Sequence, residues 1–203
     1  MRTFVGFGSV FLILFIASTA TAQIEPGKMR ISAGVVGFER SRMNLEDDFD
    51  MDGNSTSFQA VPGGDLTFGF APTQRFELGV TTALTRIDID PDGAARDSGG
   101  WSFGVGPYMA WNLPLNRSRT LTMGPQVGVA YRRVDTRDFE SNQAELSFGP
   151  QMKWFVADSA SIDLGFLVSL RAGRARLSNF AGTDESHALG YTFGPRISIS
   201  IWP

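Results

Sequence analysis

The sequence lacks cysteine altogether and has a single histidine, His187, among its 203 residues. The absence of cysteine excludes disulfide frameworks, thiol catalysis, cysteine-ligated zinc and the lipidated cysteine of a bacterial lipoprotein. A single histidine excludes any site that needs two. A strong charge of one sign is also missing, because 18 basic and 21 acidic residues leave a net charge of −3. Nothing in this balance indicates a nucleic-acid partner.

Glycine and phenylalanine are abundant instead. The chain has 23 glycines and 17 phenylalanines, while 19% of its residues are charged. This composition is typical of a protein with many strands and is unusual for a helical enzyme. The length fits a single domain.

Residues 1–22 have the features of a secretory signal peptide. Arg2 forms a short positive region, an apolar stretch follows, and Ala20 and Ala22 are small residues suited to signal peptidase. We expect cleavage after Ala22, which leaves residues 23–203 as one mature domain. The alternative, an uncleaved membrane anchor, is disfavoured because the apolar stretch is shorter than the ~20 residues of a helical span.

Beyond the predicted signal, apolar and polar residues alternate and form no long hydrophobic run. In residues 98–116, Trp101 and Phe103 share one parity, whereas Ser102 and Gly104 share the other. A period of two is the pattern of a β-strand with one apolar face. It predicts eight strands, each of roughly ten residues or more. The other stretches are 28–38 (of ambiguous parity), 58–70 (less regular), 76–85, 120–132, 145–154, 162–171 and 189–201.

The links between these stretches alternate between short and long. Outer-membrane barrels have short periplasmic turns and longer outer loops. The alternation therefore predicts an all-β fold, an eight-stranded antiparallel up-and-down transmembrane barrel with both termini in the periplasm. The short links are 71–74, 113–118 and 157–160, and the long ones are 39–57, 88–98, 135–142 and 177–187.

Residues 28–202 resemble the small eight-stranded outer-membrane barrels of the OmpA transmembrane domain and OmpX type in their alternating strands, in the asymmetry of their links and in the Phe-Gly-Pro signature. The resemblance implies a monomer in the outer membrane of a Gram-negative bacterium. Such barrels usually finish on an outward aromatic residue, whereas Trp202 breaks the parity of the last strand, which weakens the assembly signal. We also expect no peptidoglycan-binding domain after the eighth strand.

The apolar face of the barrel either meets lipid or forms the core of a soluble barrel of the lipocalin type. Trp101 and Trp111 lie on one face, roughly 23 Å apart along the axis of a barrel whose strands tilt by about 45°. A lipid-facing band is about 25 Å tall, with an aromatic girdle at each rim. Because Trp154 and Tyr131 also lie near strand ends, the spacing favours a lipid-facing surface.

The opposite face carries four acids and four bases. Side chains fill the interior of a barrel this narrow, and isolated buried charges are costly. We therefore expect the two sets to pair as a network that plugs the lumen. The alternative is a narrow path for water or ions. These residues are Asp65, Glu77, Glu145, Asp163, Arg132, Lys153, Arg171 and Arg196.

Four Gly-Pro pairs recur at similar distances from the periplasmic ends of their strands. Proline lacks the amide donor of a strand ladder, so we expect bulges at these positions. The inward glycines are expected to clear room for long lumenal side chains. The pairs are Gly106-Pro107, Gly124-Pro125, Gly149-Pro150 and Gly194-Pro195.

Residues suited to catalysis are nearly absent. Some outer-membrane barrels modify lipid A with a histidine beside a serine and an acid, and the set Asp184, Glu185, Ser186 and His187 is the one match, in the last predicted outer loop. A nucleophile and a base so close together on a loop rarely reach the required geometry. We therefore predict no enzymatic activity, no catalytic residue and no cofactor.

Two predicted outer loops contain Asp-x-Asp-x-Asp-Gly, the opening half of a calcium loop. The closing position, where a bidentate glutamate belongs, is Gln59 in the first loop and Gly99 in the second. Weak calcium binding is one expectation, and plain acidic turns are the other. The aspartates are Asp48, Asp50, Asp52, Asp88, Asp90 and Asp92.

Arginine greatly outnumbers lysine, and several arginines gather at the predicted outer rim. Guanidinium groups suit the phosphates of lipopolysaccharide, while snorkelling at the interface is the alternative. The rim arginines are Arg86, Arg132, Arg133, Arg137, Arg174 and Arg176.

The sequence as a whole predicts a non-enzymatic integral outer-membrane protein, structural or adhesive through its extracellular loops. Its expected partners are outer-membrane lipid, lipopolysaccharide and an extracellular ligand that the sequence does not identify. A small channel is the second hypothesis, and a lipid A-modifying enzyme is the third. The fold by itself does not choose among them.

Overall fold

The computed structural model describes residues 24–46, 53–59, 65–89, 98–136, 139–179 and 182–203. Within these ranges, no helix is long and apolar enough to cross a membrane. Most of the described chain is strand. The strands are β1 (Met29–Glu46), β2 (Gly53–Gln59), β3 (Asp65–Thr73), β4 (Phe76–Ile89), β5 (Ser98–Trp111), β6 (Leu113–Pro114), β7 (Leu121–Thr136), β8 (Phe139–Ala157), β9 (Ala160–Asn179) and β10 (Gly182–Ile201).

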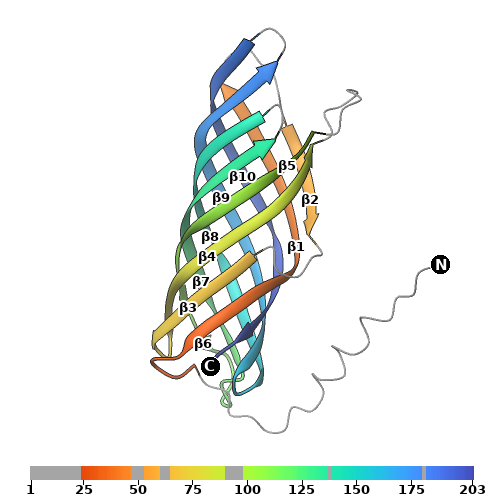
Figure 1. Cartoon of the computed structure of the whole chain (residues 1–203). Coiled ribbons are helices and arrows are strands. Elements are labelled where there is room, and N and C mark those ends of the chain that lie inside the picture. Colours follow the sequence, from red (N-terminus) through yellow and green to blue (C-terminus); the bar gives the residue numbers. More distant parts are fainter. Residues whose placement is uncertain (1–23, 47–52, 60–64, 90–97, 137–138, 180–181) are drawn as a thin grey trace, which may run out of the picture.

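The strands form one antiparallel sheet that closes into a barrel (Figure 1). Neighbours in sequence pair around the ring, and β10 closes it by pairing with β1, as in Ile31 with Ile201. β2 and β3 pair with successive parts of β1, and β6 extends the pairing of β5 with β7. The described residues therefore form a ring of eight strands, which confirms the predicted up-and-down barrel.

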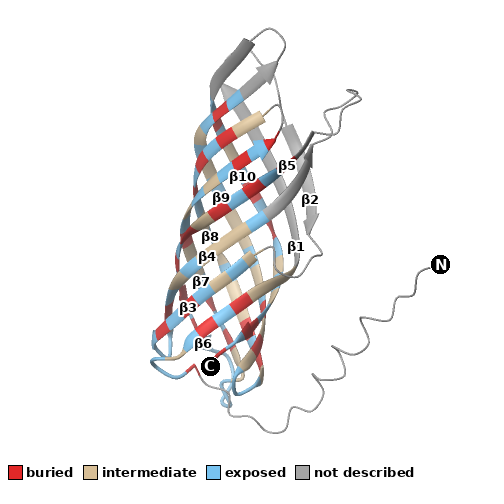
Figure 2. Cartoon of the chain, in the orientation of Figure 1, coloured by how far each residue is buried: buried red, intermediate tan, exposed pale blue. Residues whose placement is uncertain are grey.

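Buried and exposed residues alternate along the strands (Figure 2), and the large exposed residues are apolar whereas most buried ones are polar. In β5, exposed Trp101 and Phe103 flank buried Ser102, and most buried side chains are polar or charged. A soluble barrel needs the reverse arrangement, because burial of apolar surface drives folding in water. Large exposed apolar residues, one from each strand of the ring, are Ile31, Phe68, Leu78, Phe103, Val129, Phe148, Phe166 and Ile199.

The aromatic residues expected in the two girdles all face outward. Trp101 lies near the start of β5 and Trp111 at its end, and their side chains are 57% and 37% exposed. Tyr131 and Trp154 are exposed as well. The apolar outer surface therefore carries aromatic residues at both of its rims, as a lipid-facing band requires.

A change of register in β1 explains the ambiguous pattern of the first strand. β1 pairs with β10 in one register up to Gly34 and in another from Val36, so that Val35 is an extra residue. Before it, Arg30 is buried and Ile31 is exposed. An inserted residue breaks the period of two. The two halves of this strand consequently do not share one parity.

Three of the four links expected to be long loops lie largely in strands, which corrects the prediction. Residues 39–46 and 53–57 of the first expected loop belong to β1 and β2. β7 ends at Thr136 and β8 begins at Phe139, while β9 ends at Asn179 and β10 begins at Gly182. Most residues of these two expected loops belong to strands. The cause is that the strands continue beyond the apolar band, where their outward residues are polar, as Arg133, Asn142 and Arg174 are. A polar stretch alone does not distinguish such a strand end from a loop.

The expectation of bulges at the Gly-Pro pairs is wrong. The register is unchanged across all four pairs. At three of the pairs the backbone of the adjacent strand requires glycine. A Cβ on Gly106 would lie 1.9 Å from the Val129 oxygen, one on Gly124 would lie 2.0 Å from the Trp111 oxygen, and one on Gly149 would lie 1.9 Å from the Phe166 oxygen. Close approach of neighbouring strands, and not space for long lumenal side chains, explains these three glycines.

Candidate functional site

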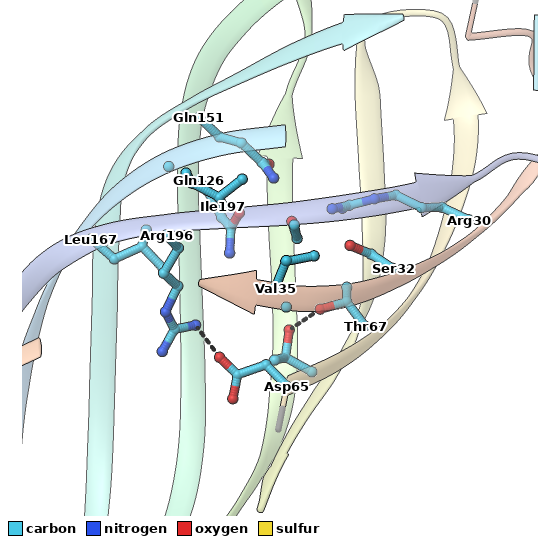
Figure 3. Close-up of a pocket in the computed structure, with 14 residues that line it drawn as sticks. Arg30, Ser32, Val35, Asp65, Thr67, Gln126, Gln151, Leu167, Arg196 and Ile197 are labelled. Carbon is cyan, nitrogen blue, oxygen red and sulfur yellow. Dashed lines mark hydrogen bonds and ion pairs between the residues drawn. The ribbon is translucent and has the colours of Figure 1, made fainter. Parts of the chain in front are cut away.

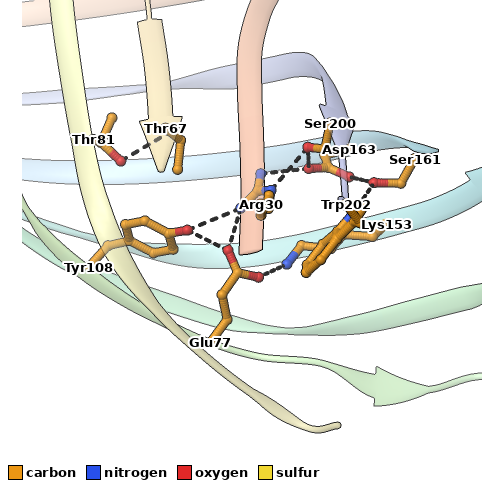
Figure 4. A network of polar contacts seen from close by, with 10 residues as sticks. All are labelled: Arg30, Thr67, Glu77, Thr81, Tyr108, Lys153, Ser161, Asp163, Ser200 and Trp202. Atoms are coloured by element: carbon orange, nitrogen blue, oxygen red, sulfur yellow. Dashed lines mark hydrogen bonds and ion pairs between the residues drawn. The ribbon is translucent and has the colours of Figure 1, made fainter. Parts of the chain in front are cut away.

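Buried charged side chains from several strands meet inside the barrel (Figure 4). Glu77 and Asp163 closely follow the short links 74–75 and 158–159, and short links lie at the periplasmic end of outer-membrane barrels. Arg30 donates from Nη1 to Glu77 Oε1 at 2.7 Å and from Nη2 to Asp163 Oδ2 at 2.6 Å. Its Nε donates to Ser200 Oγ at 3.0 Å. These side chains come from β1, β4, β9 and β10, and each is at most 3% exposed. One guanidinium thus joins four strands across the lumen.

Two further residues complete this cluster, which we call the periplasmic plug. The Lys153 ammonium donates to Glu77 Oε2, and the Tyr108 hydroxyl donates to Glu77 Oε1. Two acids and two bases balance, and each is paired with an opposite charge. Such pairing offsets the cost of burying charge. The periplasmic plug comprises Arg30, Glu77, Tyr108, Lys153, Asp163 and Ser200.

Trp202 covers the periplasmic plug at the end of the barrel. Its Nε1 donates to Ser161 Oγ at 3.1 Å, its ring lies 5.7 Å from that of Phe155, and the Lys153 ammonium lies 5.1 Å from its ring centroid. Its side chain is 1% exposed, so the break in parity noted in the sequence turns this residue inward. Ile24 belongs to the same buried cluster. Both ends of the described chain therefore lie at one end of the barrel, as predicted.

A second group of ion pairs, the upper cluster of Arg132, Glu145 and Arg171, lies farther along the lumen. Glu145 Oε2 accepts hydrogen bonds of 2.9 Å from Nε of Arg132 and Nε of Arg171. The carboxylate side chain is 8% exposed, and the arginines are 13% and 11% exposed. Glu145 precedes Lys153 by eight residues on β8, which corresponds to roughly 19 Å along the axis at a tilt of about 45°.

The four acids and four bases expected inside the barrel all form ion pairs there, which confirms that prediction, except that Asp163 pairs with Arg30, a base outside the predicted set. Between the two clusters, Arg196 Nη1 lies 3.4 Å from Asp65 Oδ2 (Figure 3). The other six residues belong to the periplasmic plug or to the upper cluster.

Sequence reasoning did not assign three members of the periplasmic plug: Arg30, Tyr108 and the uncharged Ser200. Arg30 precedes the inserted residue of β1, so the first strand has no single parity that would place it. Tyr108 shares the parity of the inward residue Ser102, so the alternation along β5 already indicated that its side chain faces the lumen. Space for its hydroxyl exists because two glycines face it: a Cβ on Gly69 or Gly79 would lie 2.6 or 2.8 Å from that oxygen.

The outer end of the barrel carries an exposed row of polar residues, which we call the outer rim row. Cross-strand pairing joins Arg133 of β7 to Asn142 of β8, Asn142 to Arg174 of β9, and Arg174 to His187 of β10. All four residues are exposed. Tyr131, the adjacent outward residue on β7, donates its hydroxyl to Asn142 Oδ1 at 2.5 Å. The row therefore borders the apolar band directly.

The predicted rim arginines divide into three groups. Arg133, Arg174 and Arg176 are exposed at the outer end. Arg132 belongs to the upper cluster inside the barrel, which corrects its assignment to the rim. The side chains of Arg86 and Arg137 lie outside the described part of the chain.

The serine and histidine considered for lipid chemistry lie on a strand, which corrects their placement in a loop. β10 includes both residues, and Ser186 pairs with Ala175 while His187 pairs with Arg174. Consecutive positions of a regular strand belong to opposite faces of the sheet. This backbone arrangement does not favour a serine and its neighbouring histidine as nucleophile and base.

Other predictions fall outside the described residues. The predicted signal peptide 1–22 is one of them, and calcium binding is another, so both stay predictions. In the ranges that the structure describes, no group of three or more histidine, cysteine, aspartate or glutamate side chains is arranged to hold a metal ion. Asp88 lies in β4 without a described side chain, and the other aspartates of the two motifs, Asp48, Asp50, Asp52, Asp90 and Asp92, are not described.

The sequence matches no family model and no curated protein. Its fold is similar to the crystal structure of the outer membrane protein OprG from Pseudomonas aeruginosa, with a TM-score of 0.60 and 10% identity over 91% of this chain and 99% of that one. It is also similar to the solid-state NMR structure of the outer membrane protein AlkL in lipid bilayers, with a TM-score of 0.60 and 11% identity over 90% of this chain and 92% of that one. By this fold and by its apolar outer face, the chain is a small eight-stranded β-barrel of the bacterial outer membrane.

Proposed function

We propose that the protein is a non-enzymatic outer-membrane barrel that keeps its lumen closed and acts, structurally or in adhesion, through its outer end. The observation that supports this proposal is the periplasmic plug. Arg30 and Lys153 meet Glu77 and Asp163 across the lumen, and all four side chains are nearly inaccessible. A passing ion would have to separate these pairs in a region of low dielectric, which is costly.

Planar-bilayer recording tests closure against the alternative of a small channel. The refolded mature barrel is expected to give no steady conductance. A double variant, Glu77→Ala with Lys153→Ala, removes one acid and one base together and should give conductance events that the wild-type barrel lacks. Reproducible unit conductance of the wild-type barrel would contradict closure and support the channel.

The partner that we propose for the outer rim row is lipopolysaccharide. Arg174 lies beside Asn142 and His187, next to the apolar band, at the level where lipid phosphates meet the protein. Guanidinium groups bind phosphate oxygens through two parallel hydrogen bonds. We assign the phosphate contact to Arg174 because it lies in the middle of the exposed row, on the strand between those of Asn142 and His187.

Binding of lipopolysaccharide to the refolded barrel in detergent tests this assignment. Arg174→Gln should weaken binding several-fold, and added salt should reduce the difference because the contact is charged. Arg75→Gln, which removes an exposed arginine from a periplasmic turn, is the matched control and should leave affinity unchanged. Equal affinities of the two variants would argue against the row as the binding surface.

The absence of enzymatic activity has a separate test. Mass spectrometry of lipid A from cells that express the wild-type protein, the His187→Ala variant or neither should give the same acyl-chain profile. A change that depends on His187 would support the lipid A-modifying hypothesis and overturn the non-enzymatic one.

A further inference from the structure

The hairpin of β6 and β7 combines exposed apolar residues with two exposed arginines. Its link spans residues 115–120, and β6 lies near the end of the barrel at which the C-terminus lies (Figure 1). Leu113 and Leu115 are 47% and 54% exposed. Arg117 and Arg119 follow them in the link and are exposed as well. The apolar outer surface therefore continues into this hairpin and gives way there to positive charge. We call these four residues the periplasmic basic edge.

Aromatic side chains mark the border of the lipid-facing band beside this edge. The rings of Phe76 and Trp111 lie 5.3 Å apart, and Trp111 belongs to the girdle at the periplasmic rim. Leu113 and Leu115 come directly after it in the sequence. A chain that passes from leucine to arginine at this border suits the boundary between acyl chains and headgroups, because arginine extends its charged end toward water.

No carboxylate competes for the arginines within this link or the neighbouring one. The links 115–120 and 74–75 contain no acidic residue. They are joined, because Arg119 Nη1 donates to Gln74 Oε1 at 3.0 Å. The link 158–159, by contrast, contains Asp158 and no base. Positive charge is therefore concentrated on one side of this end of the barrel, where it attracts an anionic group.

The backbone of the link holds Arg119 in an unusual conformation. Its φ is 57°, in the left-handed region that glycine and asparagine adopt more readily than arginine. Asn116 fixes the turn, because its backbone oxygen accepts from Arg119 N at 3.1 Å and its Oδ1 accepts from Leu121 N at 3.1 Å. The turn itself does not require arginine, so the guanidinium needs a separate explanation.

We propose that the periplasmic basic edge binds an anionic phospholipid of the periplasmic leaflet. Arg117 and Arg119 contact the phosphate diester, since guanidinium groups bind phosphate oxygens through paired hydrogen bonds. The acyl chains contact Leu113 and Leu115. This site lies at the opposite end of the barrel from the outer rim row and does not depend on the lipopolysaccharide contact proposed there.

Native mass spectrometry of the delipidated, refolded barrel tests the proposal, with phosphatidylglycerol and phosphatidylcholine present in equal amounts in detergent. The barrel should retain phosphatidylglycerol preferentially and in a saturable manner, and the Arg174→Gln barrel should do the same. Glycerol phosphate, which has no acyl chains, should compete only weakly. Equal retention of the two lipids would overturn the site, and full competition by glycerol phosphate would overturn the lipid class. Loss of the preference in Arg174→Gln would assign the lipid to the outer rim row instead.

Substitutions in the link locate the binding. Arg117→Gln and Arg119→Asn should each reduce the preference for phosphatidylglycerol roughly fivefold, the contribution of one basic residue at an anionic surface. Arg176→Gln, which removes an exposed arginine at the outer end, is the matched control and should leave the preference unchanged.

Arg119→Asn also separates lipid binding from a structural role of the turn. Because asparagine accepts the left-handed conformation, this variant should unfold in urea at the same concentration as wild type. A barrel that keeps both its stability and its full preference for phosphatidylglycerol in Arg119→Asn and in Arg117→Gln would exclude the periplasmic basic edge as the binding site.

Discussion

Arg30 links strands that lie far apart in the sequence. Its guanidinium contacts two carboxylates, a phenol and a hydroxyl from four different strands, at positions up to 170 residues away in sequence. Glu77 in turn accepts from Arg30, Lys153 and Tyr108. Loss of one member leaves several charged or polar partners without a counterpart in a buried site.

At the residue scale, Glu77→Gln is expected to lower the free energy of unfolding by about 3–5 kcal/mol, because it leaves buried Lys153 without its carboxylate. Glu145→Gln should cost less, since the upper cluster is more exposed. Ser147→Ala should stay within about 0.5 kcal/mol of wild type. Urea unfolding of the barrel in lipid vesicles, followed by tryptophan fluorescence, measures all three. Equal and small losses for the two glutamate variants would indicate a well-hydrated lumen.

At the scale of strands, glycines of the inner face fall into two kinds. Gly106 and Gly149 lie where the backbone of the adjacent strand leaves no room for a Cβ, whereas Gly104 and Gly165 have ordinary contact distances. The Gly-Pro pattern marks the first kind but does not reveal its cause. That cause depends on how closely paired strands approach each other, which is a property of the closed sheet.

The variant Gly106→Ala should destabilise the barrel by about 1–3 kcal/mol or more, because its Cβ meets the Val129 oxygen. Gly104→Ala, on the same strand and the same face, should be neutral or stabilising by up to about 1 kcal/mol. The same vesicle unfolding assay compares the two. A stable Gly106→Ala barrel would mean that β5 and β7 separate easily at this level.

For the whole molecule, the exposed apolar band determines where the barrel is stable. Phe148 lies midway along β8 between Asn142, which borders the band at the outer end, and Trp154 near the periplasmic end. The outward side chains between these two residues are apolar, as a lipid-facing surface requires. We therefore expect the protein to depend on a bilayer or detergent.

Substitution at different depths tests this arrangement. Phe148→Arg should destabilise the barrel folded in vesicles by about 2–4 kcal/mol, whereas Asn142→Arg, at the border of the band, should destabilise it by only about 0–1 kcal/mol. Cell fractionation gives an independent measure, since the mature protein should sediment with outer membranes. Recovery of a monomer from the aqueous periplasmic fraction would support the soluble barrel.

The sequence by itself determined which residues face the lumen and which face lipid over most of the barrel. A period of two assigns alternate residues to opposite faces whatever strand lies next to them. For this reason the sequence correctly predicted that the charged residues of β4, β7, β8, β9 and β10 face the lumen. It also correctly predicted that Trp101, Trp111 and Trp154 face outward. Short turns at one end were also visible in the sequence.

Only the tertiary structure decided which acid meets which base, where β1 changes parity, and where the lumen is open or closed. These features depend on the register between strands and on closure of the ring, which join residues from opposite ends of the chain. Arg30 meets Asp163 because β1 pairs with β10 and β10 with β9. Alternation within a single strand carries no information about such pairing, because it repeats unchanged when a neighbouring strand shifts by two residues.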